Sequence, residues 1–198
     1  MLEVCINPGR REAGCDEAGR GPLAGPVVAA AVILPDGYRN ARLNDSKQLG
    51  EHQRDQLREE IEREALAWAV AIVEPDEIDR LNILHASTHA MCLAVQQLNT
   101  RPDFLLIDGN RFYNETGIPY QCIVKGDAKY MPIAAASILA KTHRDELMTR
   151  LHHEYPHYGW DRNKGYPTAE HYQAIEQYGI TPYHRRSFTL YKQHSLFD

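Results

Sequence analysis

The sequence contains the segment Cys15-Asp16-Glu17-Ala18-Gly19-Arg20-Gly21-Pro22, in which two adjacent acids stand directly before a turn with one arginine between two glycines. Carboxylate oxygens are the ligands that hard divalent cations prefer. A turn flanked by glycines lets backbone N–H groups approach an anionic ligand closely. One short segment therefore carries residues suited to metal binding and residues suited to phosphate binding.

Apolar runs on both sides of this segment predict two strands, over 13–18 and over 27–34, and an antiparallel pairing is one arrangement that fits their close succession. Helical spacing and apolar runs predict the other elements. Together they indicate one α/β domain with about five strands, in which helices flank a mixed sheet. The further strands are expected over 67–73, 104–107 and 120–124, and helices over 51–66, from Pro75 with a break near Asn82, over 133–155 and over 169–178 before Gly179.

Composition sets the broad class of the protein. The chain has 198 residues, of which 43% are hydrophobic, so it is large enough for a substantial core. Its net charge of −5 argues against nucleic-acid binding over the whole surface, although a local basic strip near the C-terminus fits the sequence. The four cysteines form no CxxC pair, which favours reduced thiols. No signal sequence or long apolar segment is found, so we expect a cytoplasmic protein without membrane contact.

Four acids share a placement, because Asp16, Glu17, Asp108 and Asp127 each lie at or just after an apolar, strand-like run. Ligands of open α/β sheets bind beyond the strand ends. Neighbouring strands lie ~4.8 Å apart, which would let Asp16 and Asp108 grip one ion. An all-oxygen set favours Mg²⁺ or Mn²⁺ over zinc. Any one of these acids alone is better explained as a solvated strand end, and the adjacent Gly-Arg-Gly turn is what favours a site.

The adjacency of Asp16 and Glu17 poses a geometric difficulty. Successive residues of a regular strand point to opposite faces of the sheet, so the two side chains cannot both face one site. A bulge, or a strand that ends at Glu17, would remove the difficulty, and Gly19 nearby makes such an irregularity reasonable. We therefore expect an irregular strand end at this point.

Other residues have weaker claims to a role. Arg20, Lys47 and Lys125 are candidates for phosphate contacts, since each lies beside a turn or an acid of interest. Tyr166 stands on a stiff Gly-Tyr-Pro loop, where its ring either stacks on a sugar or base or lies half buried. The run His184-Arg185-Arg186 either touches a nucleic-acid backbone or is a solvated charge run.

The segment from Asp16 to Val28 closely resembles the signature of bacterial ribonuclease HII. The resemblance implies a ribonuclease H-like fold, an α/β fold with a five-stranded mixed β-sheet flanked by helices. It also implies a single catalytic domain over 1–198, with a helical C-terminal portion about 150–190 and a tail over 191–198. Further motifs that carry the resemblance are Leu43-Asn44-Asp45-Ser46-Lys47, Ile107-Asp108-Gly109-Asn110, Val124-Lys125-Gly126-Asp127, Ala135-Ala136-Ser137-Ile138-Leu139-Ala140-Lys141, Lys164-Gly165-Tyr166-Pro167-Thr168 and His184-Arg185-Arg186-Ser187-Phe188.

The resemblance implies an endonuclease that cleaves the RNA strand of RNA–DNA hybrids. It would also cut 5′ to single ribonucleotides in duplex DNA, leaving a 5′-phosphate and a 3′-hydroxyl. Two Mn²⁺ or Mg²⁺ ions would act at the metal-binding acids Asp16, Glu17, Asp108 and Asp127. Contacts to the substrate are implied for Gly19, Arg20 and Gly21 at the ribose 2′-hydroxyl and for Tyr166 by stacking, and Lys47 is kept as a candidate for a phosphate contact from its position in the sequence.

The related ribonuclease HIII usually carries a lysine in the Gly-Arg-Gly position and an extra N-terminal domain. Here Arg20 holds that position and 15 residues precede Asp16, so the HII assignment is preferred. Two other functions stay open: a different carboxylate-metal DNA nuclease of the same fold, such as a resolvase, and a hybrid-binding protein without turnover.

The last residues resemble a short peptide by which bacterial repair proteins bind the sliding clamp. In Gln193-His194-Ser195-Leu196-Phe197-Asp198, the glutamine, Leu196 and Phe197 would make the contact by inserting an extended tail into an apolar pocket. The alternative is a tail that binds nothing. Nothing in the sequence demands more than a monomer.

Overall fold

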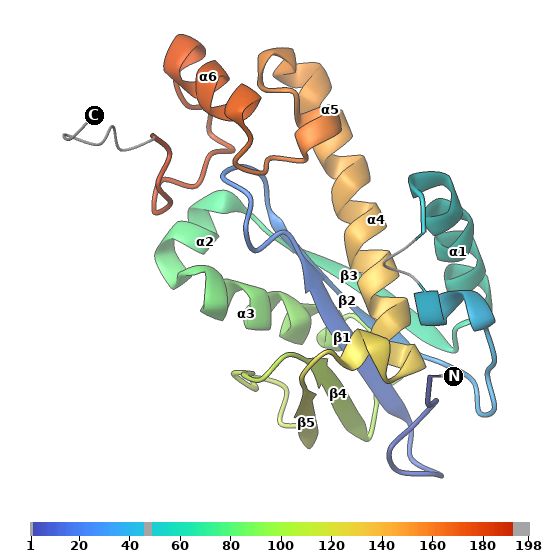
Figure 1. The fold of residues 1–198 in the computed structure, drawn as a ribbon. Helices are drawn as coiled ribbons and strands as arrows, with labels where there is room; N and C mark the ends of the chain where they lie inside the picture. Colours follow the sequence, from blue (N-terminus) through green and yellow to red (C-terminus); the bar gives the residue numbers. More distant parts are fainter. Residues whose placement is uncertain (1, 46–48, 192–198) are drawn as a thin grey trace.

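A five-stranded mixed β-sheet lies at the centre of the computed structural model, which describes residues 2–45 and 49–191 (Figure 1). Strand β2 pairs antiparallel with both β1 and β3, whereas β4 pairs parallel with both β1 and β5. The predicted mixed sheet and the antiparallel pairing of the first two strands are confirmed. In the order β3-β2-β1-β4-β5, the strands are Ala67–Val73, Val27–Ile33, Glu12–Ala18, Phe104–Asp108 and Tyr120–Ile123.

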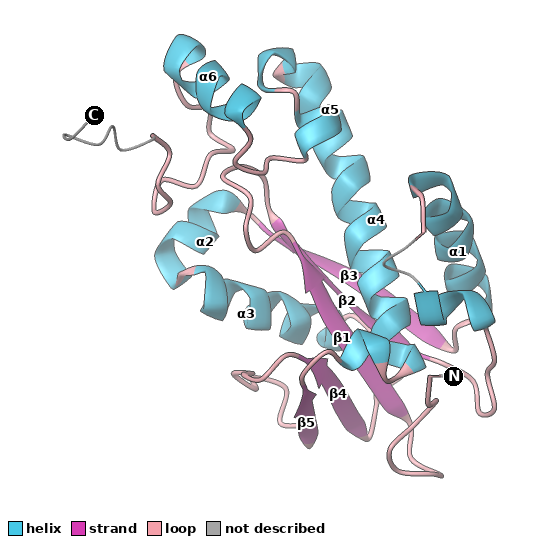
Figure 2. Cartoon of the chain, in the orientation of Figure 1, coloured by secondary structure: helices cyan, strands magenta, loops and turns pink. Residues whose placement is uncertain are grey.

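Helices cover both faces of this sheet (Figure 2). Helices α2 and α3 lie on one face, α1 and α4 lie on the other, and α5 and α6 continue beyond the C-terminal half of α4. The helices are α1 (Glu51–Glu64), α2 (Pro75–Leu81), α3 (Ile83–Gln96), α4 (Met131–Glu154), α5 (Trp160–Asn163) and α6 (Ala169–Tyr178), with short 3₁₀ helices η1 (Ala41–Asp45), η2 (Gly126–Ala128) and η3 (Pro156–Tyr158).

The centre of the sheet is built from small apolar residues. Every residue of β2 is buried, as expected for a strand that is covered on both faces. Gly14 of β1 lies against the start of α4, where a Cβ atom would stand 2.1 Å from the backbone carbon of Pro132. Only a glycine fits there, so α4 crosses β1 at close range and brings Ser137 next to the acidic end of the strand.

The predicted break at Asn82 is confirmed. Asn82 has a φ of 66° and separates α2 from α3. Its side-chain oxygen accepts hydrogen bonds from the N–H groups of Leu84 and His85, which satisfies the free donors of the first turn of α3. The start of α3 is thereby fixed close to the end of β1, where Leu84 lines a cavity with Glu17.

The C-terminal helices have an apolar cluster of their own. Trp160 and Ile175 pack there against Met148 and Leu151 of α4, and the cluster includes Leu23 from the loop between β1 and β2. This loop therefore connects the sheet with the C-terminal helices. The sequence predicted α6 with its bounds, whereas α5 was not predicted because four residues are too few for a helical pattern. In the described part of the chain, no helix is long and apolar enough to cross a membrane.

Candidate active site

Three of the four predicted acids lie at one end of the sheet. Asp16 and Glu17 stand near the end of β1, and Asp108 is the last residue of β4, the parallel neighbour of β1. The pairing of Cys15 with Ile107 brings Asp16 level with Asp108. Asp127 is buried in η2, and the N–H of the preceding Gly126 donates a hydrogen bond of 2.7 Å to Asp108 Oδ1.

The prediction of an irregular strand end at Glu17 is wrong. Residues 14–18 of β1 pair one to one with residues 32–28 of β2, without a bulge, so the strand runs regularly through Glu17. Asp16 accordingly faces α4, where it is hydrogen-bonded to Ser137, while Glu17 faces α3 beside Ser87. Glu17 also lines a cavity on the α4 side, so its carboxylate lies at the end of the sheet where the two faces meet.

Asp16 is buried, Glu17 and Asp108 are partly buried, and the three carboxylates repel one another. Asp16 is 6% exposed, and burial, followed by the charges of Glu17 and Asp108, raises its pKa well above the ordinary value, against the hydrogen bond from Ser137. Burial also raises the pKa of Glu17, with Arg20 acting in the opposite direction and Asp108 adding to the rise. A cation among these carboxylates would relieve the repulsion.

In this conformation the guanidinium group of Arg20 places a positive charge beside Glu17. Its Nη1 lies 3.3 Å from Glu17 Oε1, and its side chain is half exposed. Within the part of the chain that the structure describes, no three Asp, Glu, His or Cys side chains lie close enough together to hold a metal ion. Asp16, Glu17 and Asp108 carry the oxygen donors that Mg²⁺ or Mn²⁺ prefers, but in this conformation they are not drawn together around one point and Glu17 is engaged by Arg20.

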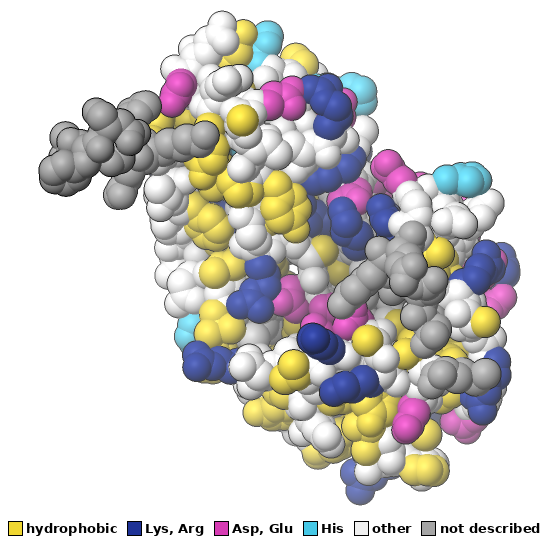
Figure 3. Space-filling view, viewed as in Figure 1, with side chains coloured by type: hydrophobic (Ala, Val, Ile, Leu, Met, Phe, Trp, Pro, Cys, Tyr) yellow, Lys and Arg dark blue, Asp and Glu magenta, His cyan; other side chains and the backbone are white. Residues whose placement is uncertain are grey.

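Two cavities meet at Glu17. The one on the α4 side, of about 440 Å³, is lined by Gly19, Arg20, Gly21 and Tyr166. The other, of about 230 Å³, lies on the α3 side and includes Asp108. In the space-filling view, Lys and Arg side chains lie next to Asp and Glu side chains over the middle of the face shown (Figure 3). The α4-side cavity, which we call the substrate cavity, is also lined by residues that sequence reasoning missed: Arg54, Ser137, Lys141 and Arg144.

A larger cavity, of about 630 Å³, lies at the opposite end of the sheet. Glu12 at the start of β1 and Asp103 before β4 line it, together with Leu34 after β2. Glu12 is engaged there, because it accepts hydrogen bonds from the N–H groups of Ile6 and Asn7. The acids of β1 and β4 that the sequence singled out do not reach this cavity, so its size does not make it the better candidate.

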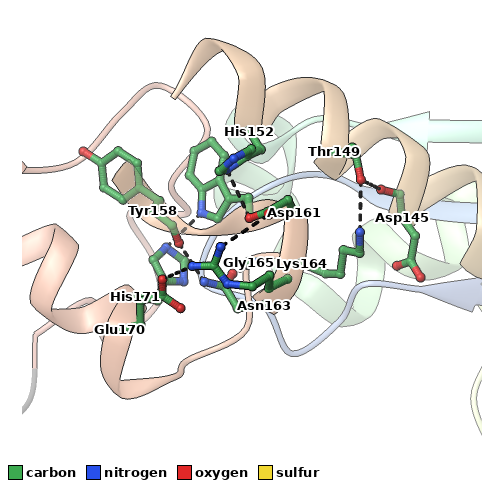
Figure 4. Close-up of polar contacts among 12 residues, drawn as sticks. Asp145, Thr149, His152, Tyr158, Asp161, Asn163, Lys164, Gly165, Glu170 and His171 are labelled. Atoms are coloured by element: carbon green, nitrogen blue, oxygen red, sulfur yellow. Dashed lines mark hydrogen bonds and ion pairs between the residues drawn. The ribbon is translucent and has the colours of Figure 1, made fainter. Parts of the chain in front are cut away.

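Tyr166 lies on the loop between α5 and α6. Figure 4 shows the neighbouring residues Asn163, Gly165 and His171 of this region. Asn163 binds the N–H of Gly165 through its side chain and the N–H of Tyr166 through its carbonyl. His171 Nδ1 lies 3.0 Å from the carbonyl oxygen of Tyr166. Tyr166 is 44% exposed, and one carbon of its ring lies 3.5 Å from where a Cβ atom of Gly21 would stand. The tyrosine therefore presents its ring beside the Gly-Arg-Gly turn.

The remaining candidates divide into three groups. Lys47 and the tail residues Gln193, Leu196 and Phe197 lie outside the described residues. Lys125 is exposed at the start of η2.

The third group is the run His184-Arg185-Arg186, for which the sequence predicted either a contact with a nucleic-acid backbone or a solvated charge run. Both predictions are wrong for His184 and Arg185. His184 and Arg185 are buried, so they are neither solvated nor free to touch a nucleic-acid backbone, whereas Arg186 is exposed. No local pattern distinguishes a buried arginine in a charged run from an exposed one.

Comparison of the sequence with protein-family models matches residues 13–191 to the model of ribonuclease HII. A curated ribonuclease HII of Bacteroides thetaiotaomicron is 62% identical over 190 residues, which cover 96% of this chain and 95% of the relative. A ribonuclease HII of Porphyromonas gingivalis is 57% identical over 188 residues, which cover 95% of this chain and 94% of that relative.

Solved structures of lower identity share the fold. The crystal structure of ribonuclease H2 from Pyrococcus horikoshii superposes with a TM-score of 0.76 at 29% identity, covering 91% of this chain and 94% of that chain. The ribonuclease HII in a complex with PCNA from Archaeoglobus fulgidus superposes with a TM-score of 0.78 at 26% identity, covering 94% of this chain and 98% of that chain.

Proposed function

Because the chain belongs to the ribonuclease HII family and is a ribonuclease H, we propose that it cleaves the RNA strand of RNA–DNA hybrids and cuts 5′ to single ribonucleotides in duplex DNA. The observation that carries the proposal is the substrate cavity, where the Gly19–Gly21 turn and the ring of Tyr166 stand beside Glu17. This arrangement supports recognition of one nucleotide at a time, next to the acids.

The four acids Asp16, Glu17, Asp108 and Asp127 would hold two divalent ions, Mn²⁺ or Mg²⁺. When bound, two such ions supply an activated water and stabilise the leaving 3′-oxygen. The regular strand means that Asp16 and Glu17 approach from opposite faces of the sheet, so they do not act as one pair from one side. Asp108 adjoins both, since its charge raises the pKa of each. The products are a 5′-phosphate and a 3′-hydroxyl.

The turn and the tyrosine would select the substrate. Backbone N–H groups of Gly19, Arg20 and Gly21 approach the ribose and its 2′-hydroxyl, the group that distinguishes RNA from DNA. Tyr166 stacks on the sugar or base at the junction between ribonucleotide and deoxyribonucleotide. Lys47 contacts a phosphate. Recognition of one hydroxyl group predicts weak sequence preference.

Two partners are proposed, the nucleic acid and a sliding clamp. The archaeal relative whose structure was solved with PCNA supports the second, since that protein forms a clamp complex. Here Leu196 and Phe197 of the tail would make the contact. The Leu196→Ala/Phe197→Ala double substitution should abolish clamp binding measured by surface plasmon resonance, and unchanged affinity would refute the contact. A monomeric state and a cytoplasmic location stay predictions.

Incubation with Mg²⁺ or Mn²⁺ and a DNA duplex that holds one ribonucleotide tests the proposed function. We expect a single cut 5′ to the ribonucleotide, whereas cutting only branched DNA would support a resolvase-like nuclease and binding without cleavage a hybrid-binding protein. Asp108→Asn provides the matched control, because asparagine keeps the oxygen that accepts the Gly126 N–H while losing the charge. It should abolish turnover and leave the circular dichroism spectrum unchanged.

A further inference from the structure

Two arginine side chains lie buried beneath the loop between β1 and β2. Arg144 of α4 is 1% exposed and Arg185 of the C-terminal segment is 0% exposed. Neither forms an ion pair with a carboxylate in the part of the chain that the structure describes, although burial of an unpaired guanidinium is costly. Burial lowers the pKa of Arg144 to about 10 and that of Arg185 to about 9. Such costly groups need a structural explanation.

Both guanidinium groups donate to backbone carbonyls. Arg185 donates to the carbonyl oxygens of Gly19 at 2.6 Å, Arg20 at 3.1 Å and Gly25 at 2.9 Å. Arg144 contacts the loop farther along, where it donates to the carbonyl oxygens of Ala24 at 3.2 Å and Pro26 at 3.0 Å. It also donates to the carbonyl oxygen of Lys164, after α5, at 3.0 Å. The loop is thus held by its carbonyl groups from beneath.

The contacts of Arg185 determine where two N–H groups point. A peptide unit is planar and trans, so its N–H points away from its C=O. The carbonyl of Gly19 shares a peptide unit with the N–H of Arg20, and the carbonyl of Arg20 shares one with the N–H of Gly21. Because Arg185 holds both carbonyls, it directs two consecutive N–H groups away from itself. Gly19, Arg20 and Gly21 line the substrate cavity, whereas Arg185 is not among its lining residues.

We propose that Arg185 is a positioning residue, which aims the N–H groups of Arg20 and Gly21 into the substrate cavity and thereby sets the preference for a ribonucleotide. The inference rests on the proposed function. It assigns the C-terminal segment a part in substrate selection without any contact between Arg185 and the substrate. Arginine suits the task because its planar fork offers several donors in a fixed geometry, whereas lysine offers one mobile ammonium group.

The segment that carries Arg185 is itself fixed in place. Its backbone pairs with the loop, since the N–H of Arg185 donates to Leu23 and the N–H of Gly25 donates to Tyr183, both through carbonyl oxygens. Cζ of the Arg185 guanidinium also lies over the ring of Phe188, 5.1 Å from the ring centroid.

Asp79 of α2 holds the segment from outside. Its carboxylate accepts hydrogen bonds of 2.9 Å from the N–H groups of Arg186 and Ser187, and one of 2.5 Å from the Ser187 hydroxyl. With neighbours on both sides anchored, the Arg185 side chain acts as a fixed support for the turn.

Two substitutions, Arg185→Lys and Arg185→Ala, test the inference. The readout is the ratio of dissociation constants for an all-DNA duplex and for the same duplex with one ribonucleotide, measured by fluorescence anisotropy with divalent ions removed by EDTA. We expect the wild-type protein to prefer the ribonucleotide and each variant to lose about tenfold of that preference, the equivalent of one to two hydrogen bonds. Guanidinium ion should restore the ratio in Arg185→Ala, whereas sodium at equal concentration should not.

Val95→Ala is the control for lost stability, because Val95 is buried near the C-terminal end of α3 and does not line the substrate cavity. The Val95→Ala substitution should lower the unfolding midpoint and leave the ratio of the two dissociation constants unchanged. An Arg185→Lys protein that retains the wild-type ratio, or an Arg185→Ala protein that guanidinium does not rescue, would overturn the inference alone. A wild-type protein that neither cleaves nor prefers the ribonucleotide duplex would overturn the proposed function and the inference with it.

Discussion

Acidification should destabilise the protein through two buried histidines beneath Tyr166. The N–H of Thr181 donates to His184 Nδ1 at 2.9 Å, so the proton of that imidazole is assigned to Nε2, which lies 3.2 Å from His171 Nε2. Trp160 Nε1 donates to the same nitrogen of His171 at 3.1 Å. His171 Nδ1 then donates to the Tyr166 carbonyl. One set of neutral tautomers gives both imidazole N–H groups an acceptor, with His171 Nε2 shared by two donors. A proton added to His184 Nδ1 would face the Thr181 N–H and leave Thr181 Oγ1, 2.9 Å away, as its only acceptor among the described contacts.

The size of the effect follows from the pKa of His184. Burial, followed by the charge of His171, lowers this pKa from 6.5 to about 4, and burial lowers the pKa of His171 in the same direction. The unfolded chain therefore binds the proton more readily than the folded protein, so the stability is complete above the unfolded pKa and is lost as the pH falls toward the folded one. At about pH 5 the loss from His184 alone is roughly 2 kcal/mol.

Urea unfolding at neutral pH and at about pH 5 measures this loss, with His184→Asn as the comparison. Asparagine keeps an oxygen that can accept the Thr181 N–H but does not titrate in this range. Between the two pH values the free energy of unfolding of the wild-type protein should fall by roughly 2 kcal/mol more than that of the variant. The carboxylates and the other histidines contribute to both proteins, so their effect cancels in the comparison. Equal losses in the two proteins would refute the assignment of a buried neutral His184.

Four further substitutions, at three positions, probe the surroundings of the site. Gly14→Ala should lower the free energy of unfolding by roughly 3 kcal/mol in urea titrations, because its Cβ would stand 2.1 Å from the Pro132 backbone. Gly19→Ala should lower the cleavage rate of a single-ribonucleotide duplex, because φ is +95° and the new Cβ would stand 2.1 Å from Arg144 Nε; a wild-type rate would contradict this. In the same assay Tyr166→Phe should stay near the wild-type rate, while Tyr166→Ala should lose about tenfold if the ring stacks.

The elements of the fold could be predicted where burial leaves a pattern in consecutive residues. The apolar run of β2 and the helical spacing of α6, closed by Gly179, each fix their element locally. Helix α5 has only four residues and shows no such pattern. The acids Asp16 and Asp108 were found because each lies at or near the end of a buried strand, a relation that the sequence itself displays.

The support of the turn could not be predicted, because its partners are far apart in the sequence. Arg185 lies 166 residues from Gly19 and 165 from Arg20, and its contacts are to carbonyl groups that every residue has. Side-chain identity therefore says nothing of the pairing. Arg144 is hidden in the same way within the charged half of α4. Buried arginines that bind backbone are found only once the fold places them.

The adjacency of Asp16 and Glu17 shows how a correct rule led to a wrong expectation. Strand alternation does send the two side chains to opposite faces, and the error lay in requiring one face to hold the whole site. At the end of the sheet both faces are within reach of Asp108, so a regular strand serves both cavities. A shift of β1 by one residue would exchange the faces of Asp16 and Glu17 and move Gly14 from beneath α4. The close crossing at Gly14 therefore fixes the register on which the acid positions depend.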